Sequence, residues 1–216
     1  VRSFKLDEFS LFGVHLALRE PPRYAAAAHD PDLDRAFKVG IGFESVADFE
    51  SMWTAVRRGE PPDPPRLYAC CPTLFDPTQA PAGFHTAFCW APAPYSLREG
   101  DWDRLASDYA DRCLEAWRRA APNMTKDNIL ARRVLSPLDV YRKMSSMPLV
   151  GVFHGRMTQD QLESFRPLPG LSDGRTPIEG LYLGGAALHP GGGILGACGY
   201  IAAGTVLSDL GIRAWW

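Results

Sequence analysis

The sequence predicts a mixed α/β fold, because segments patterned as β-strands alternate with segments patterned as helices along its 216 residues. An apolar, aromatic-rich run at residues 9–18 has the composition of a buried strand. Apolar residues spaced by three and four predict a helix at residues 45–56. A glycine-rich loop joins an apolar strand to an apolar helix within residues 176–211. Hydrophobic residues make up 46% of the chain, which is enough for one full-sized core.

The first half of the chain is expected to hold further strands around a capped helix. Ser45 followed by Asp48 is typical of a helix N-terminus, and the proline-rich run at residues 61–65 ends that helix. Residues 66–72 and 85–91 are then predicted to be two strands, joined by a loop rich in turn-forming residues.

The second half begins with the longest predicted helix, at residues 101–121, whose apolar residues fall along one side. A strand follows at residues 129–135. Residues 136–139, Ser-Pro-Leu-Asp, have the pattern of a helix start with no functional role. A short helix is expected at residues 158–163. The chain then forms a short buried strand at residues 181–183 before its last helix.

Composition and charge exclude several classes of function. The net charge of −2 and the lack of long basic runs argue against nucleic-acid binding. The five cysteines have no zinc-ligand spacing and are expected to be reduced, small hydrophobic residues. No signal peptide is expected, and Pro190 with Gly191–Gly193 interrupts the long uncharged stretch, so a membrane span is not predicted. We therefore expect a cytoplasmic protein.

The stretch at residues 176–211 is the most informative for function. A strand ending in Gly184-Gly185, a glycine-rich loop and a helix from about residue 194 to residue 210 place free backbone N–H groups at a helix start. Such groups favour electron-rich ligand atoms, and glycines 191–193 allow a flat ring to approach the backbone. The alternative, that these glycines only permit tight packing, stays open at this point.

The same stretch resembles the closing motif of the phytoene-desaturase and carotenoid-isomerase-like branch of FAD-dependent, amine-oxidase-type enzymes. The resemblance rests on TPI at residues 176–178, GLYL at 180–183, HPGGG at 189–193 and Gly196. It extends over nearly the whole chain in the family's order, through EPPRY at 20–24, DP at 76–77, APAGFH at 80–85, APN at 121–123, SPLD at 136–139 and FRP at 165–167.

This resemblance implies an α+β substrate-domain portion at residues 1–150. It also implies the returning strand–loop–helix of a Rossmann-like FAD domain at residues 151–216. The implied cofactor is FAD, and the implied activity is flavin-dependent dehydrogenation or desaturation of a small apolar or aromatic substrate. No catalytic residue or metal ligand is implied. The implied cofactor-binding residues are Gly185, Ala186, His189, Pro190, Gly191, Gly192, Gly193, Ile194 and Gly196.

Two departures from the family pattern affect this expectation. The family commonly has GAGTHP where this chain has GAALHP, so Ala187 narrows the room near the cofactor and Leu188 removes a hydroxyl. No GxGxxG motif for the FAD pyrophosphate is present. We therefore expect a separate N-terminal FAD-binding chain, encoded apart or made by cleavage, to complete the site in a heteromeric complex.

Two other hypotheses remain open: a non-catalytic binding or scaffolding subunit that retains the fold, and a redox-neutral, flavin-dependent isomerase. Individual candidates also have alternative roles. His154 is expected to be a core histidine rather than a substrate contact, and Arg166 either clamps an anionic substrate or forms a structural salt bridge. Aromatic residues that either line a substrate cavity or pack in the core are Phe88, Trp90 and Tyr95. Trp215-Trp216 is expected to pack on a partner chain.

Overall fold

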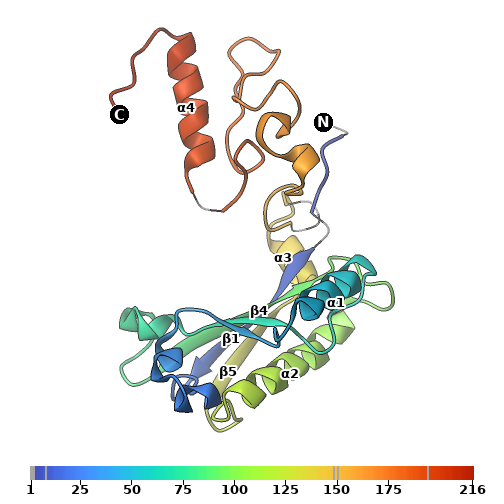
Figure 1. Ribbon diagram of the computed structural model, residues 1–216, viewed down its shortest axis with the longest axis vertical. Coiled ribbons are helices and arrows are strands. Elements are labelled where there is room, and N and C mark those ends of the chain that lie inside the picture. Colours follow the sequence, from blue (N-terminus) through green and yellow to red (C-terminus); the bar gives the residue numbers. More distant parts are fainter. Residues whose placement is uncertain (1–2, 8, 148, 150, 194) are drawn as a thin grey trace. The chain divides into compact units, whose positions relative to one another are not determined.

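The chain folds into two compact units, shown in Figure 1. A computed structural model describes residues 3–7, 9–147, 149, 151–193 and 195–216. The sheet unit is Phe9–Met144, and the loop-rich unit combines Val1–Glu8 with Ser145–Trp216. The assignment of residues 1–150 to substrate and residues 151–216 to FAD stays a prediction.

The sheet unit is built on five antiparallel strands in the order β2-β3-β4-β1-β5. The central pair, β1 and β4, is in register from Ser10 opposite Ala93 to Leu18 opposite His85. The strands are β1 (Ser10–Leu18), β2 (Val39–Ile41), β3 (Leu67–Cys70), β4 (His85–Ala93) and β5 (Ile129–Leu135). The short edge strand β2 is absent from the sequence prediction, because three residues carry too little periodicity to reveal it.

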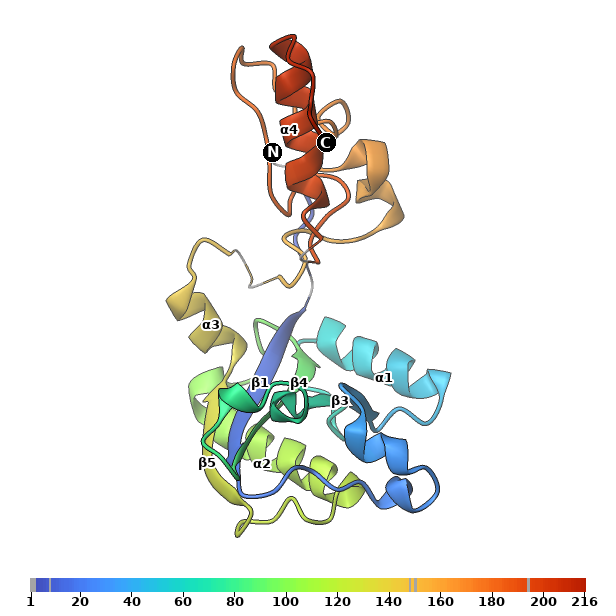
Figure 2. The same ribbon diagram turned by 90° about the vertical axis from the view of Figure 1, so that its left-hand side faces the viewer.

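One face of the sheet packs against the long helix α2 (Trp102–Ala120), which runs alongside the strands in Figures 1 and 2. Strand alternation turns Phe12 of β1 toward this helix. Its ring lies 5.3 Å from that of Trp102, in a stacked arrangement, and 5.0 Å from that of Tyr109, edge to face. Because Phe12, Tyr109 and Trp117 have no exposed surface, this face forms the hydrophobic core.

Two shorter helices complete the sheet unit. Helix α1 (Val46–Arg57) has the predicted capping box between Ser45 and Asp48, and its Trp53 ring packs edge to face on Phe9 at 4.8 Å. Helix α3 (Pro137–Lys143) likewise starts with the predicted cap at Ser136. Short 3₁₀ turns connect these elements at Ala25–Ala28, Pro31–Arg35, Pro72–Leu74 and Pro77–Gln79.

The loop-rich unit contains one long helix, α4 (Ala197–Asp209), preceded by irregular chain. The strand predicted at residues 181–183 is wrong: within the described residues only one antiparallel bridge forms there, between Arg175 and Tyr182. The helix predicted at residues 158–163 is instead two 3₁₀ turns, Gln159–Gln161 and Glu163–Phe165. None of the described helices is long and apolar enough to cross a membrane.

Candidate functional site

A fully buried arginine, Arg166, organises the glycine-rich loop of the loop-rich unit. Its guanidinium donates to the carbonyl oxygens of Phe153 and Ala186, both at 3.0 Å, and of Arg156 at 3.3 Å. Its charge also lies over the Phe4 ring, at 5.9 Å. Burial lowers the pKa of this side chain. The predicted substrate clamp is wrong, because the Arg166 side chain is fully buried, and the predicted salt bridge is not found among the described residues, where main-chain oxygens accept its hydrogen bonds.

Two glycines of the HPGGG sequence are packed tightly against the surrounding chain. A Cβ on Gly191 would lie 2.8 Å from the Met157 sulfur, and a Cβ on Gly192 would lie 3.1 Å from the Phe153 backbone. Backbone atoms cannot move aside as a flexible side chain can. Tight packing is therefore one role of these two glycines, as the alternative interpretation of the sequence proposed.

Other glycines of the loop have open space beside them. A Cβ on Gly185 or Gly196 would meet no atom within 4 Å, and both residues have a left-handed backbone, with φ of 87° and 68°. Gly196 precedes α4, whose first turn has no side-chain cap, so its N–H groups are available to a ligand. The helix thus starts at Ala197 rather than near residue 194, and the predicted site residue Ile194 lies outside the described residues.

His189 is the residue of this loop best placed for binding. Its Nδ1 atom is buried and has no hydrogen-bond partner within the described part of the chain. The side chain lines an open depression of about 500 Å³. The remaining lining residues come from residues 163–201: Glu163, Ser164, Ser172, Asp173 and Ile201.

The two residues that depart from the family pattern lie on different sides of the loop. Leu188 is buried with 1% of its surface exposed, and its carbonyl oxygen accepts from the Cys198 thiol at 3.4 Å. Ala187 is exposed. Leu188 therefore packs in the interior of the loop-rich unit.

In the sheet unit, aromatic side chains gather on the face opposite α2. Alternation places Phe88 and Trp90 of β4 there, with ring centroids 4.9 Å apart, and Trp90 is 38% exposed. His15 of β1 stacks on Phe88 at 5.7 Å. The third predicted aromatic, Tyr95, packs edge to face on Tyr141 of α3. The sequence analysis missed His15, although it falls between the buried positions of β1.

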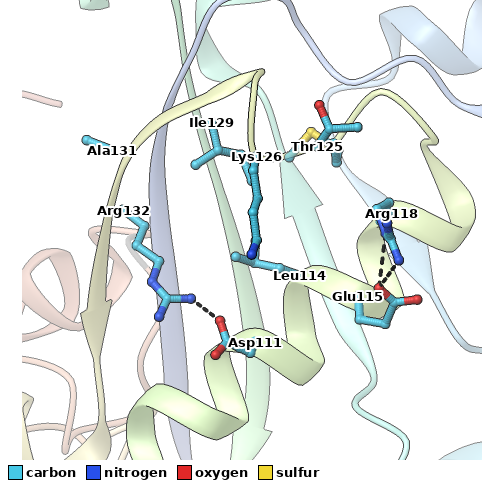
Figure 3. A pocket seen from close by; sticks show the side chains of 10 residues that line it. Asp111, Leu114, Glu115, Arg118, Thr125, Lys126, Ile129, Ala131 and Arg132 are labelled. Atoms are coloured by element: carbon cyan, nitrogen blue, oxygen red, sulfur yellow. Dashed lines mark hydrogen bonds and ion pairs between the residues drawn. The ribbon is translucent and has the colours of Figure 1, made fainter.

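A second depression, of about 800 Å³, lies between α2 and the chain leading into β5 (Figure 3). Asp111 pairs with Arg132 across it, and Glu115 pairs with Arg118 at 2.6 Å. These exposed pairs satisfy one another and resemble an ordinary protein surface. None of the site residues predicted from the sequence lies here.

No thiol or metal chemistry emerges from the described residues. All five cysteines are free and buried. Burial raises the pKa of Cys89 to about 12 and also raises that of Cys71, which keeps these thiols protonated near neutral pH. Among the described side chains, no three of histidine, cysteine, aspartate or glutamate come together as metal ligands.

The chain is similar to several oxidoreductases. It is 35% identical over 207 residues to the pyridine nucleotide-disulfide oxidoreductase domain-containing protein 2 of Rattus norvegicus, an alignment covering 91% of the chain and 35% of that protein. It is 33% identical to a subunit of the limonene dehydrogenase of Castellaniella defragrans, covering 100% of the chain and 40% of that relative. No protein-family model matches the chain.

A third relative is the lycopene-forming phytoene desaturase of a Paracoccus species, which is 30% identical over 93% of the chain and 37% of that enzyme. The chain thus spans little more than a third of the length of these relatives. The relationship defines the class as an oxidoreductase. More narrowly, the chain belongs to the phytoene desaturase-like FAD oxidoreductases, as the HPGGG motif predicted.

The packing of Gly192 predicts a stability effect. We expect Gly192→Ala to lower the free energy of unfolding by about 1–3 kcal/mol, because its Cβ would press on the Phe153 backbone. The matched change Gly199→Ala, in open space on α4, should leave stability unchanged or raise it by up to about 1 kcal/mol. Denaturant unfolding of both variants tests this, and equal stabilities would contradict it.

Arg166 predicts a larger effect. Arg166→Met should lower the free energy of unfolding by about 2–4 kcal/mol, because three buried carbonyl oxygens lose a charged donor. Arg166→Lys should retain only part of the stability that Arg166→Met loses, since an ammonium lacks the planar fork that reaches all three carbonyl oxygens. The exposed Arg213→Met is the control. A fully stable Arg166→Met variant would show that the arginine does not organise the loop.

His15 predicts a pH dependence. Burial, followed by the charges of Arg133 and Lys143, lowers its pKa below the usual 6.5. Just below pH 6.5 the unfolded chain therefore binds more protons, so stability should fall as the pH drops from that value through the folded-state pKa. His15→Gln should flatten the fall between pH 7 and pH 5 in urea unfolding, with His29→Gln as the control. An unchanged slope would contradict the prediction.

Proposed function

We propose that the chain supplies the substrate-side sheet and the glycine-rich flavin loop of an FAD-dependent dehydrogenase or desaturase. The observation that carries the proposal is the buried Nδ1 of His189 inside the HPGGG sequence, which has no hydrogen-bond partner in the part of the chain that the structure describes. A buried ring nitrogen without a partner is costly, so a ligand that hydrogen-bonds to it would relieve that cost.

The residues around His189 fit a flat cofactor. Gly185 and Gly196 leave open space beside the loop, and the uncapped start of α4 offers backbone N–H groups to an electron-rich atom. We propose that these groups and His189 hold one side of FAD. When bound, FAD would accept a hydride from a substrate C–H bond, and release of a proton to water from the adjacent C–H or N–H group would complete the double bond.

The chain's own residues would orient the substrate and exclude water. Phe88 and Trp90 offer a half-exposed aromatic surface, which suits an apolar or conjugated substrate body. Arg166 would act only indirectly, by fixing the carbonyl of Ala186 and hence the course of the loop.

We also propose that a dinucleotide-binding half completes the FAD site. Large apolar residues are exposed on and around α4, including Leu195 at 73%, Tyr200 at 62% and Trp215 at 90%. Such a surface is typical of one that another part of the assembly covers. The limonene dehydrogenase relative is named as one subunit of that enzyme, which supports a heteromeric arrangement.

The first experiment is purification from the native source under non-denaturing conditions, followed by intact mass and a visible absorption spectrum. We expect the spectrum of an oxidised flavin, together with a GxGxxG half. The masses tell whether that half is joined to this chain or separate. A folded, colourless chain that takes up no FAD would contradict the proposal and favour the hypothesis of a non-catalytic binding or scaffolding subunit. Turnover without net electron transfer would favour the isomerase.

The role of His189 has its own test in that assembly. His189→Leu should weaken FAD retention by about tenfold, the effect of losing one hydrogen bond, while leaving stability nearly unchanged because Nδ1 has no partner in the described chain. His154→Leu serves as the control at a histidine outside this site; His154 is exposed, so its predicted core position is wrong. Equal FAD retention in the His189→Leu and unmodified proteins would show that His189 does not contact the cofactor.

A further inference from the structure

A cationic group on the open face of the sheet, formed by Arg133 and Lys143, has no ion-pair partner among the described residues. Consecutive residues of β5 point to opposite faces, so Arg132 and Arg133 diverge. Arg132 is opposite Leu16 in the ladder and pairs with Asp111 of α2. Arg133 is opposite His15, on the face that carries Phe88. These two neighbouring arginines therefore experience different surroundings.

The charge balance around Arg133 is one-sided. Arg142 of α3 pairs with Asp103 at 2.6 Å, but Arg133 and Lys143 form no ion pair among the described residues. The charged groups that act on the His15 imidazole are these same two cations. His15 itself makes no side-chain hydrogen bond within the described part of the chain. An anion placed beside His15 would be attracted by Arg133 and Lys143, and no carboxylate is among the charged groups that act on His15.

An aromatic surface adjoins this cationic group. In the ladder, Arg133, His15 and Phe88 lie side by side on β5, β1 and β4. The His15 ring stacks on Phe88, and Phe88 lies against Trp90. Two strand spacings, about 10 Å, separate the backbones of Arg133 and Phe88. A long arginine side chain bridges part of that distance, so one small molecule can contact both ends.

We propose that this face binds a small organic carboxylate with a flat, conjugated body, which packs on Phe88 and Trp90 while its carboxylate pairs with Arg133. Arginine suits this group because its planar fork matches a carboxylate in two hydrogen bonds. A neutral hydrocarbon would cover the same rings but gain nothing from the charge of the exposed Arg133. Calling the ligand a substrate rests on the proposed function, whereas the binding itself does not.

The test compares trans-cinnamate with its neutral counterpart, cinnamamide, by titration calorimetry on the purified full chain and on the flavin-containing assembly. We expect the carboxylate to bind at least tenfold more tightly. Arg133→Gln should reduce that preference to about twofold or less. Arg132→Gln, its neighbour on the opposite face, should leave the preference unchanged. Trp90→Leu should weaken both probes by a similar factor, and circular dichroism checks that each variant folds.

Three results would overturn the proposal: equal affinity for the two probes, equal loss of preference in both arginine variants, or no binding of either probe in either preparation. Binding is measured without turnover, so a failure here is distinct from a failure of the proposed function. A colourless chain that still prefers cinnamate would support the site and remove only the oxidoreductase role.

Discussion

The packing of one sheet face on helix α2 is the constraint on which the sheet unit depends. Phe12, Tyr109 and Trp117 lose all their exposed surface there, and the alternation of β1 and β4 fixes which side chains can join them. The same alternation sends every second residue to the other face. Because α2 covers only one side, Phe88 and Trp90 are left as a half-exposed aromatic surface, so the face that we propose to bind substrate is a consequence of how the core is buried.

In the loop-rich unit, a polar interaction takes the role that the core has in the sheet unit. The buried guanidinium of Arg166 draws together carbonyl oxygens from separate segments, and it forms no ion pair with a carboxylate of the described residues. Gly191 and Gly192 then allow the loop to approach those segments closely. The resulting course of the loop leaves Gly185 and the start of α4 open. Different glycines therefore serve packing and the proposed binding.

The two units support complementary parts of one proposed activity. The loop-rich unit offers a histidine nitrogen that has no partner within the described residues, and helix N–H groups without a side-chain cap, which suit an electron-rich cofactor. The sheet unit offers aromatic rings and an exposed arginine, Arg133, that forms no ion pair with the described residues, which suit an organic substrate. The chain's relatedness to phytoene desaturase-like oxidoreductases is consistent with both proposals, and the exposed apolar residues around α4 are the surface that we propose a dinucleotide-binding half covers.

The sequence by itself determined the main helices and strands of the sheet unit, because apolar periodicity and caps such as Ser45 with Asp48 are local signals. Its HPGGG motif also determined the family. The sequence pattern also predicted a strand at residues 181–183, where only a bridge forms. A strand needs a neighbouring strand to pair with, and a local pattern cannot supply one. Only the tertiary structure decided that Arg166 is buried, that Gly192 lies against Phe153 and that Arg133 has no ion-pair partner in the described part of the chain. Each of these depends on segments distant in sequence meeting in space, and no local pattern contains that information.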